Sequence, residues 1–257
     1  MSWRRSSAIL RHEFRVMLSD PSTAIFVIVM PVLMVALMKE LFADVLVSEG
    51  FSGANGSEFA VPGMAVSFAA FSVGYAGFSF FRDHGWATWD RLRASPATSA
   101  DLMVGKVLPT VCLTTLQLGV LFLLGGPLFG LHITGSVAAL TVLIVVLALS
   151  LSAFGILVTA LARTMNQLNA IGSVGGMAMA MMGGSFVPVA SMPGWAQALA
   201  PAMPTYWAMR GFRSVILEGG GLGDVVLPVV VMAGFGALFT ALAAMKFRVE
   251  DSKVYWG

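Results

Sequence analysis

The sequence predicts an all-α membrane protein with six transmembrane helices, an N-terminal amphipathic interfacial helix and short outer re-entrant helices between spans five and six. Of its 257 residues, 58% are hydrophobic and only 11% are charged, whereas soluble domains carry about 25% charged residues. No Asp, Glu, Lys or Arg occurs between Lys106 and Arg163, and a span needs about 20 such residues. The expected segments are a cytoplasmic helix over 1–20, a six-span domain over 21–246 and a cytoplasmic tail over 247–257.

The first 20 residues predict the interfacial helix, because helical spacing separates a basic stripe from an apolar one. The alternative is the n-region of a signal peptide. That alternative is disfavoured because the segment is long, contains Glu13 and is not followed by a convincing small-residue cleavage site. The basic stripe is Arg4, Arg11 and Arg15, and the apolar stripe is Trp3, Leu10, Phe14 and Met17.

Spans one and two are expected at about 22–42 and 59–81. Asp20 and Pro21 provide a cap and a first-turn proline for span one. Pro31 in its middle should kink it, because proline removes a backbone hydrogen bond. The acidic, Gly- and Ser-rich stretch 43–58 between the two spans indicates a loop.

A polar connection over 82–106 precedes spans three and four, which are expected at about 107–124 and 137–161. The connection predicts a short helix over 86–93 and a restart at Ser95-Pro96. The uncharged run that follows is too long for one span, and Gly125-Gly126-Pro127, followed by further glycines, supplies the break.

Span five is expected at 168–188, ending at Pro188, and span six at 225–245. Span five is rich in small residues, and Gly172 and Gly176 form a GxxxG pair that permits close backbone approach. The connection 191–224 is too apolar for a free loop. It predicts one or two short helices that lie in, or dip into, the outer membrane surface.

The basic residues predict the orientation of these spans. Of the 15 Lys and Arg residues, 12 fall on the side that holds both termini. The positive-inside rule therefore places both ends in the cytoplasm. The expected location is the plasma (inner) membrane of a bacterial cell. All six Trp residues fall outside the predicted hydrocarbon centres, as aromatic belts require.

Catalytic, cofactor-binding and metal sites are not expected on this chain. Cys112 is the single cysteine, and His12, His84 and His132 are scattered between the two sides. The only Gly-Lys pair, ending at Lys106, lacks the glycine spacing of a P-loop. No ionisable residue is expected at mid-membrane, which disfavours an ion-coupled carrier.

Three stretches resemble a known family: the amphipathic start with LSDPSTAIFVIVMPVLM, the cytoplasmic connection, and GGSFVPVASMPGWAQALAPAMPTYWAMRGFRSVILEGG. The layout is similar to that of ABC-2 type transporter permeases, in particular the drug-exporter branch that includes daunorubicin-resistance permeases. The third stretch is the most specific of the three. The family pattern in it is Phe186, Pro188, Pro193-Gly194-Trp195, Pro204, Tyr206 and Arg210.

The resemblance implies a permease that pairs with a second copy or a close paralogue and with two separate ABC nucleotide-binding subunits. ATP and Mg would then be bound by those subunits and no cofactor by this chain, and nucleic acid is not an expected partner. The expected function is export of a hydrophobic or amphipathic drug, antibiotic or lipid. Open alternatives are a membrane scaffold or assembly component, a polysaccharide-type ABC exporter permease, and an ATP-independent channel or carrier.

Two sets of residues are expected to carry this function. The connection after span two is the only internal polar segment long enough to receive a partner ATPase, although a solvated loop is an alternative. Large, adaptable side chains on spans two and five are candidates for the substrate path, although plain packing or lipid contact is an alternative at each position. The coupling candidates are Trp86, Trp89, Arg91, Leu92, Arg93 and Pro96, and the path candidates are Phe68, Phe71, Tyr75, Met177, Met181 and Phe186.

Overall fold

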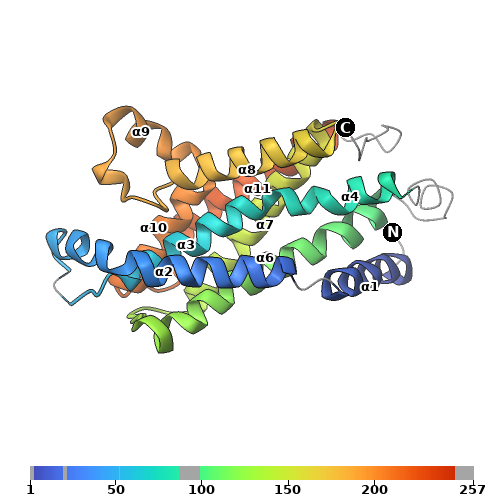
Figure 1. Ribbon diagram of the computed structural model, residues 1–257. Coiled ribbons are helices and arrows are strands. Elements are labelled where there is room, and N and C mark those ends of the chain that lie inside the picture. Colours follow the sequence, from blue (N-terminus) through green and yellow to red (C-terminus); the bar gives the residue numbers. More distant parts are fainter. Residues whose placement is uncertain (1–2, 20–21, 52, 87–98, 247–257) are drawn as a thin grey trace.

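The computed structural model describes residues 3–19, 22–51, 53–86 and 99–246, and over these ranges the chain is a bundle of helices joined by short turns (Figure 1). Helices occupy the N-terminal segment and the positions of the six expected spans. Their bounds are α1 Trp3–Ser19, α2 Ser22–Ser48, α3 Ser57–Phe71, η1 Ser72–Gly74, α4 Tyr75–Gly85, α6 Ser99–Phe129, α7 Val137–Leu161, α8 Met165–Met182, η2 Val189–Ser191, α9 Gly194–Leu199, η3 Ala200–Ala202, α10 Pro204–Leu217 and α11 Val226–Lys246.

Within the described ranges, four helical segments are long and apolar enough to cross a membrane: Ser57–Asp83, Gly105–Phe129, Val137–Leu161 and Val226–Lys246. The other two expected spans correspond to α2 and α8, both of which are helical and carry charged or amide side chains. Lys39, Glu40 and Asp44 lie in the second half of α2, and Asn166, Gln167 and Asn169 lie at the start of α8.

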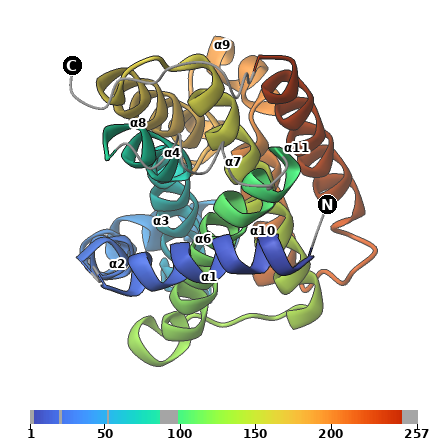
Figure 2. The same ribbon diagram turned by 90° about the vertical axis from the view of Figure 1, so that its right-hand side faces the viewer.

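The first helix runs across the bundle rather than along it (Figure 2). It packs against α6 at the end of the bundle where α4 ends and α6 begins (Figure 1). The sequence predicted this amphipathic helix, and the transverse position fits a helix that lies at a membrane surface.

The second span is the centre of the bundle. Its first half, α3, is almost entirely buried and packs against α2, α6, α8 and α10. Glycines make these contacts close: a Cβ added at Gly176 would lie 2.0 Å from the carbonyl oxygen of Ala70, and one at Gly63 would lie 2.3 Å from that of Ser185. The GxxxG pair of α8 therefore packs on the second span of the same chain.

Three helix ends differ from the expected ones. The connection between α2 and α3 begins later than predicted, because α2 continues to Ser48. The break between spans three and four begins later than predicted, since α6 runs through Gly125-Gly126-Pro127 to Phe129 and the break opens at Gly130, where φ is +72°. A helix tolerates these residues in its last turn, where continuation is no longer required.

The fifth predicted span also ends earlier than expected, at Met182 rather than Pro188. Gly184 adopts φ +86°, its N–H donates to the Met181 carbonyl, and the Ser185 N–H donates to the Ala180 carbonyl. This is a Schellman motif, which needs glycine at the left-handed position. The sequence predicted that Gly183 and Gly184 lie within span five, but they end α8.

The connection between the fifth and sixth predicted spans contains four short elements, η2, α9, η3 and α10. The longest, α10, is a core element that packs on α3, α7 and α11. Its buried side chains include Ala208, Phe212 and Val215. The predicted short helix over 86–93 and the tail 247–257 lie outside the described residues, except for Trp86, the first residue of that helix.

Candidate functional site

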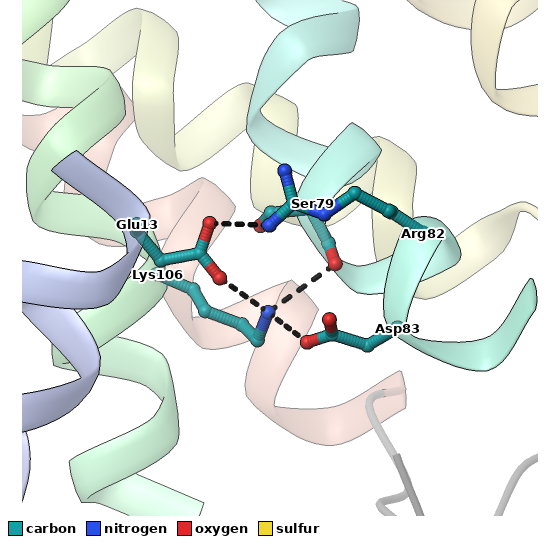
Figure 3. Close-up of polar contacts among 5 residues, drawn as sticks. All are labelled: Glu13, Ser79, Arg82, Asp83 and Lys106. Atoms are coloured by element: carbon teal, nitrogen blue, oxygen red, sulfur yellow. Dashed lines mark hydrogen bonds and ion pairs between the residues drawn. The ribbon is translucent and has the colours of Figure 1, made fainter. Parts of the chain in front are cut away.

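Four charged side chains from three helices meet in a buried cluster at the end of the bundle where α1 lies (Figure 3). Glu13 comes from α1, Arg82 and Asp83 from the end of α4, and Lys106 from α6. The Lys106 Nζ donates to Glu13 Oε1 at 2.9 Å and also to Asp83 Oδ2. The Arg82 Nη2 donates to Glu13 Oε2 at 2.7 Å. We call these four residues the charge cluster, and it fastens α1 to both α4 and α6.

The cluster meets the physical requirements for burying charge. Buried ions are tolerated when each is paired and its remaining hydrogen-bonding groups are satisfied. Lys106, only 2% exposed, uses all three of its donors, because it also donates to the Ser79 carbonyl at 3.2 Å. Its Nζ lies 5.2 Å from the centre of the Phe80 ring, and the Arg82 guanidinium lies 5.9 Å from that of Trp86.

Electrostatics favour the ionised form of Glu13. Burial raises the pKa of Glu13, but attraction and hydrogen bonding by Lys106 and then Arg82 outweigh burial, so the pKa of this carboxyl lies below its ordinary value. Glu13 is therefore a carboxylate at neutral pH. Two acids and two bases give a network that is neutral as a whole.

The cluster lies beside the segment that the sequence assigns to ATPase coupling. Arg82 and Asp83 precede that segment and Lys106 follows it, so the cluster holds the helices on either side of residues 87–98. Trp86, 64% exposed, is the one coupling candidate within the described residues. The candidates Trp89, Arg91, Leu92, Arg93 and Pro96 lie outside them.

Sequence reasoning missed the pairing in this cluster. Arg82 and Lys106 were counted only as cytoplasmic positive charge, and Glu13 only as evidence against a signal peptide. A signal was present, because Glu13 is the one acidic residue in the first 19 positions, among four arginines. An isolated acid in a basic amphipathic helix can be expected to have a specific partner.

A cavity of about 560 Å³ lies at the opposite end of the bundle from α1. It is formed by the turn after α2, the start of α3, the end of α8, one side of α10 and the start of α11. Its walls combine apolar side chains with six charged ones. The charged residues are Glu49, Glu58, Arg210, Arg213, Glu218 and Asp224.

The structure does not bring the predicted substrate-path residues into this cavity; none is among its lining residues. Phe71, Met177 and Met181 are exposed on α3 and α8, which pack side by side. Phe68 and Phe186 are half-buried, and Tyr75 opens α4 with its side chain outside the description. The exposed members of the predicted substrate path therefore lie on the surface of the chain and not in the cavity.

Several apolar helices, a transverse amphipathic helix and a buried charge cluster at one end define a multi-pass membrane protein. The profile of the ABC-2 type transporter family matches residues 5–217. The chain therefore belongs to the ABC-2 type transporter family, whose members are membrane permease subunits rather than ATPases. This confirms the resemblance drawn from the three sequence stretches.

The chain is similar to several permeases named for drug resistance. It is 29% identical over 255 residues to the daunorubicin resistance ABC transporter permease protein DrrB1 of Streptomyces coeruleorubidus, covering 96% of this chain and 88% of that one. It is 29% identical over 160 residues to the linearmycin resistance permease protein LnrN of Bacillus subtilis, covering 62% and 41%. It is 29% identical over 148 residues to the probable multidrug ABC transporter permease YbhR of Escherichia coli, covering 58% and 40%. The chain thus spans about two fifths of the length of LnrN and of YbhR but most of DrrB1.

Proposed function

We propose that this chain is the permease subunit of an ATP-driven exporter that moves a hydrophobic or amphipathic drug, antibiotic or lipid out across a bacterial plasma membrane. In this proposal α2 and α8 are the first and fifth of six spans, both termini lie in the cytoplasm, and α9 and α10 lie toward the outer side of the membrane. ATP and Mg bind to a separate nucleotide-binding subunit. Similarity to the drug-resistance permease DrrB1 over most of both chains supports this proposal.

The observation that carries the coupling part of the proposal is the charge cluster. Residues 87–98 connect Arg82 and Asp83 on one side to Lys106 on the other, and Glu13 joins both sides to α1. A force applied to that connection by an ATPase therefore reaches α1, α4 and α6 together. Such a shared, fully paired network is the kind of element that moves as a unit.

The substrate path in this proposal lies between two permease chains. Phe71, Met177 and Met181 expose apolar surface on α3 and α8. A second copy or a paralogue facing this surface encloses an apolar route along the bundle, which suits an amphipathic substrate better than a polysaccharide. Methionine side chains adapt to substrates of different shape.

The test is co-expression of the full chain with an ABC ATPase encoded beside it, followed by co-purification and an ATPase assay in vesicles. We expect the two to co-purify and amphipathic substrates to stimulate ATP hydrolysis. Trp89→Glu and Leu92→Glu should weaken co-purification or stimulation, while Glu40→Gln, on the exposed side of α2, should change neither. A chain that purifies alone as a stable oligomer without bound ATPase supports the scaffold alternative instead. Substrate-stimulated hydrolysis that both variants leave intact removes the coupling role of the 86–93 segment.

A further inference from the structure

The cavity contains a buried carboxylate without a cation partner. Glu58 is the second residue of α3, is 5% exposed and lines the cavity. Its Oε2 accepts a hydrogen bond from the Asn55 N–H at 3.1 Å. Among the residues that the structure describes, no Lys, Arg or His forms an ion pair with it.

The other carboxylates of the cavity wall are either paired with Arg213 or, in the case of Asp224, exposed. Arg213 donates to Glu49 at 2.7 Å and lies 3.5 Å from Glu218, so it is shared between two acids. Asp224 accepts a hydrogen bond from the Gly221 N–H at 2.8 Å. With four carboxylates and two guanidinium groups in its wall, the cavity is acidic overall. Glu58 is the buried carboxylate among those that have no cation partner.

The hydrogen bond to Asn55 gives Glu58 a structural role. Asn55 accepts from the Ser57 N–H while Glu58 accepts from the Asn55 N–H, a reciprocal pair like that of a capping box but formed by the residue before the N-cap, Gly56. The positive end of α3 also favours an acid there. Capping needs only an acceptor oxygen, however, and a neutral side chain supplies one. The negative charge of Glu58 is therefore not required for capping, and a buried charge is costly unless it is compensated.

The remaining walls suit an apolar body. Phe59, Pro62, Met209, Leu227 and Pro228 line the same cavity. Its volume lies within the range of small-molecule sites, about 300–1,000 Å³. A metal ion fits less well, since the described residues contain no group of three or more His, Cys, Asp or Glu arranged to hold one.

We propose that this cavity is a binding site for an organic ammonium group carried on an apolar body, with Glu58 as its counter-ion. The ammonium donates to the free side of the Glu58 carboxylate, and the apolar body lies against Phe59, Pro62 and Met209. The inference rests on the proposed function only in placing the site on the outer part of an export route. Binding to the site needs neither an ATPase nor a second chain. A soluble amphipathic amine and the headgroup of an ethanolamine phospholipid both supply the required chemistry.

The test measures binding of dansyl cadaverine, which carries a free amine, and of its neutral hydroxyl analogue to the full chain in maltoside detergent. Energy transfer from tryptophan to the dansyl group reports binding. We expect the amine to bind about ten- to a hundredfold more tightly than the alcohol, as for a charge-assisted hydrogen bond. Glu58→Gln keeps the capping acceptor and should abolish this preference, whereas Glu40→Gln, on an exposed side chain of α2, should keep it.

A second variant covers the case in which Glu58→Gln fails to fold. Leu227 lines the cavity and is 51% exposed, so Leu227→Lys adds a cation there without repacking the core. This variant should also lose the preference for the amine. Displacement of the probe by short-chain phosphatidylethanolamine identifies the headgroup as a ligand, and no displacement identifies a soluble amine.

Equal binding of amine and alcohol to the unmodified chain overturns the inference, as does an amine preference that survives in a folded Glu58→Gln or Leu227→Lys variant. Failure of the proposed function gives a different result, namely amine-selective binding by a chain that never couples to an ATPase. Conversely, ATP-driven export without amine selectivity at the cavity removes this inference alone.

Discussion

Replacing Glu13 by Gln tests whether the charge cluster holds α1 against the bundle. The carboxylate accepts charge-assisted hydrogen bonds from Lys106 at 2.9 Å and from Arg82 at 2.7 Å. Glutamine keeps one acceptor oxygen but places an amide donor where the second oxygen received a cation. One of the two buried cations therefore loses its partner on α1.

The expected cost follows from what each cation retains. Removing one partner of a buried ion pair costs about 3–5 kcal/mol when the other charge is left uncompensated. Lys106 keeps Asp83 and the Ser79 carbonyl, and Arg82 keeps its contact with the Trp86 ring. We therefore expect a cost at or below the lower limit of that range, about 2–3 kcal/mol for local opening of α1.

Native-state trypsin cleavage measures this opening, because Arg11 and Arg15 are exposed in α1 and become cleavable when the helix leaves the bundle. An opening cost lowered by 2–3 kcal/mol raises the cleavage rate about 30- to 150-fold. Glu40→Gln, which removes the exposed ion pair to Lys39 at 3.3 Å, should change the rate less than about threefold. If both variants change the rate by the same small factor, the cluster does not hold α1, and the coupling route through Glu13 is refuted.

Three further predictions follow from particular contacts. Gly176→Ala brings a Cβ to 2.0 Å from the Ala70 carbonyl oxygen and should lower the midpoint of thermal unfolding through a cost of about 1–3 kcal/mol, while Gly234→Ala, which meets nothing within 4 Å, should not. Gly184→Ala forces a side chain into φ +86° and should cost about 1–2 kcal/mol by the same measurement; a midpoint equal to that of Gly234→Ala would contradict the Schellman ending of α8. Because the folded-state pKa of Glu13 is lowered, its contribution is complete above the ordinary pKa of 4.5 and is lost as the pH falls through the lower folded value. The unfolding midpoint should therefore fall more steeply below pH 4.5 in the unmodified chain than in Glu13→Gln, and parallel pH profiles would refute the assignment.

Helix positions were predictable from this sequence because apolar length decides what can lie in a bilayer. The uncharged stretch after Lys106 had to hold two helices, and α6 and α7 are there. Helix ends were predicted less well, because glycines can either continue a helix or end it. Gly125 and Gly126 continue α6, whereas Gly183 and Gly184 end α8, and only the hydrogen bonds of the following residues distinguish the two cases.

The two polar sites were harder to predict because both depend on contacts between distant segments. Glu13 meets Lys106 across 93 positions of sequence. Glu58 was assigned to the acidic loop 43–58, yet it lies in the first turn of α3 and is buried there. Asn55 helps to hold that turn in place, since its amide donates to the carbonyls of Phe129 and Gly130 at the end of α6. Local composition does not reveal which distant residues a side chain contacts.

The second span connects these two sites, and their charge balance separates their roles. Glu58 starts the span in the cavity, and Arg82 and Asp83 end it in the charge cluster. The cluster is neutral and its Lys106 donors are all used, so it has no charge left for a ligand and serves to join helices. The cavity keeps a carboxylate without a cation partner, which is what a cationic ligand requires.

Between the cavity and the charge cluster, the second span is interrupted by the 3₁₀ turn η1. There an added Cβ at Gly172 would lie 3.0 Å from the Gly74 Cα. A 3₁₀ interruption within a long helix is a common place for a hinge. A shift of α4 at the cluster can therefore reach the cavity through η1 and α3. The direct way to detect such a shift is a change in amine affinity at Glu58 caused by Glu13→Gln.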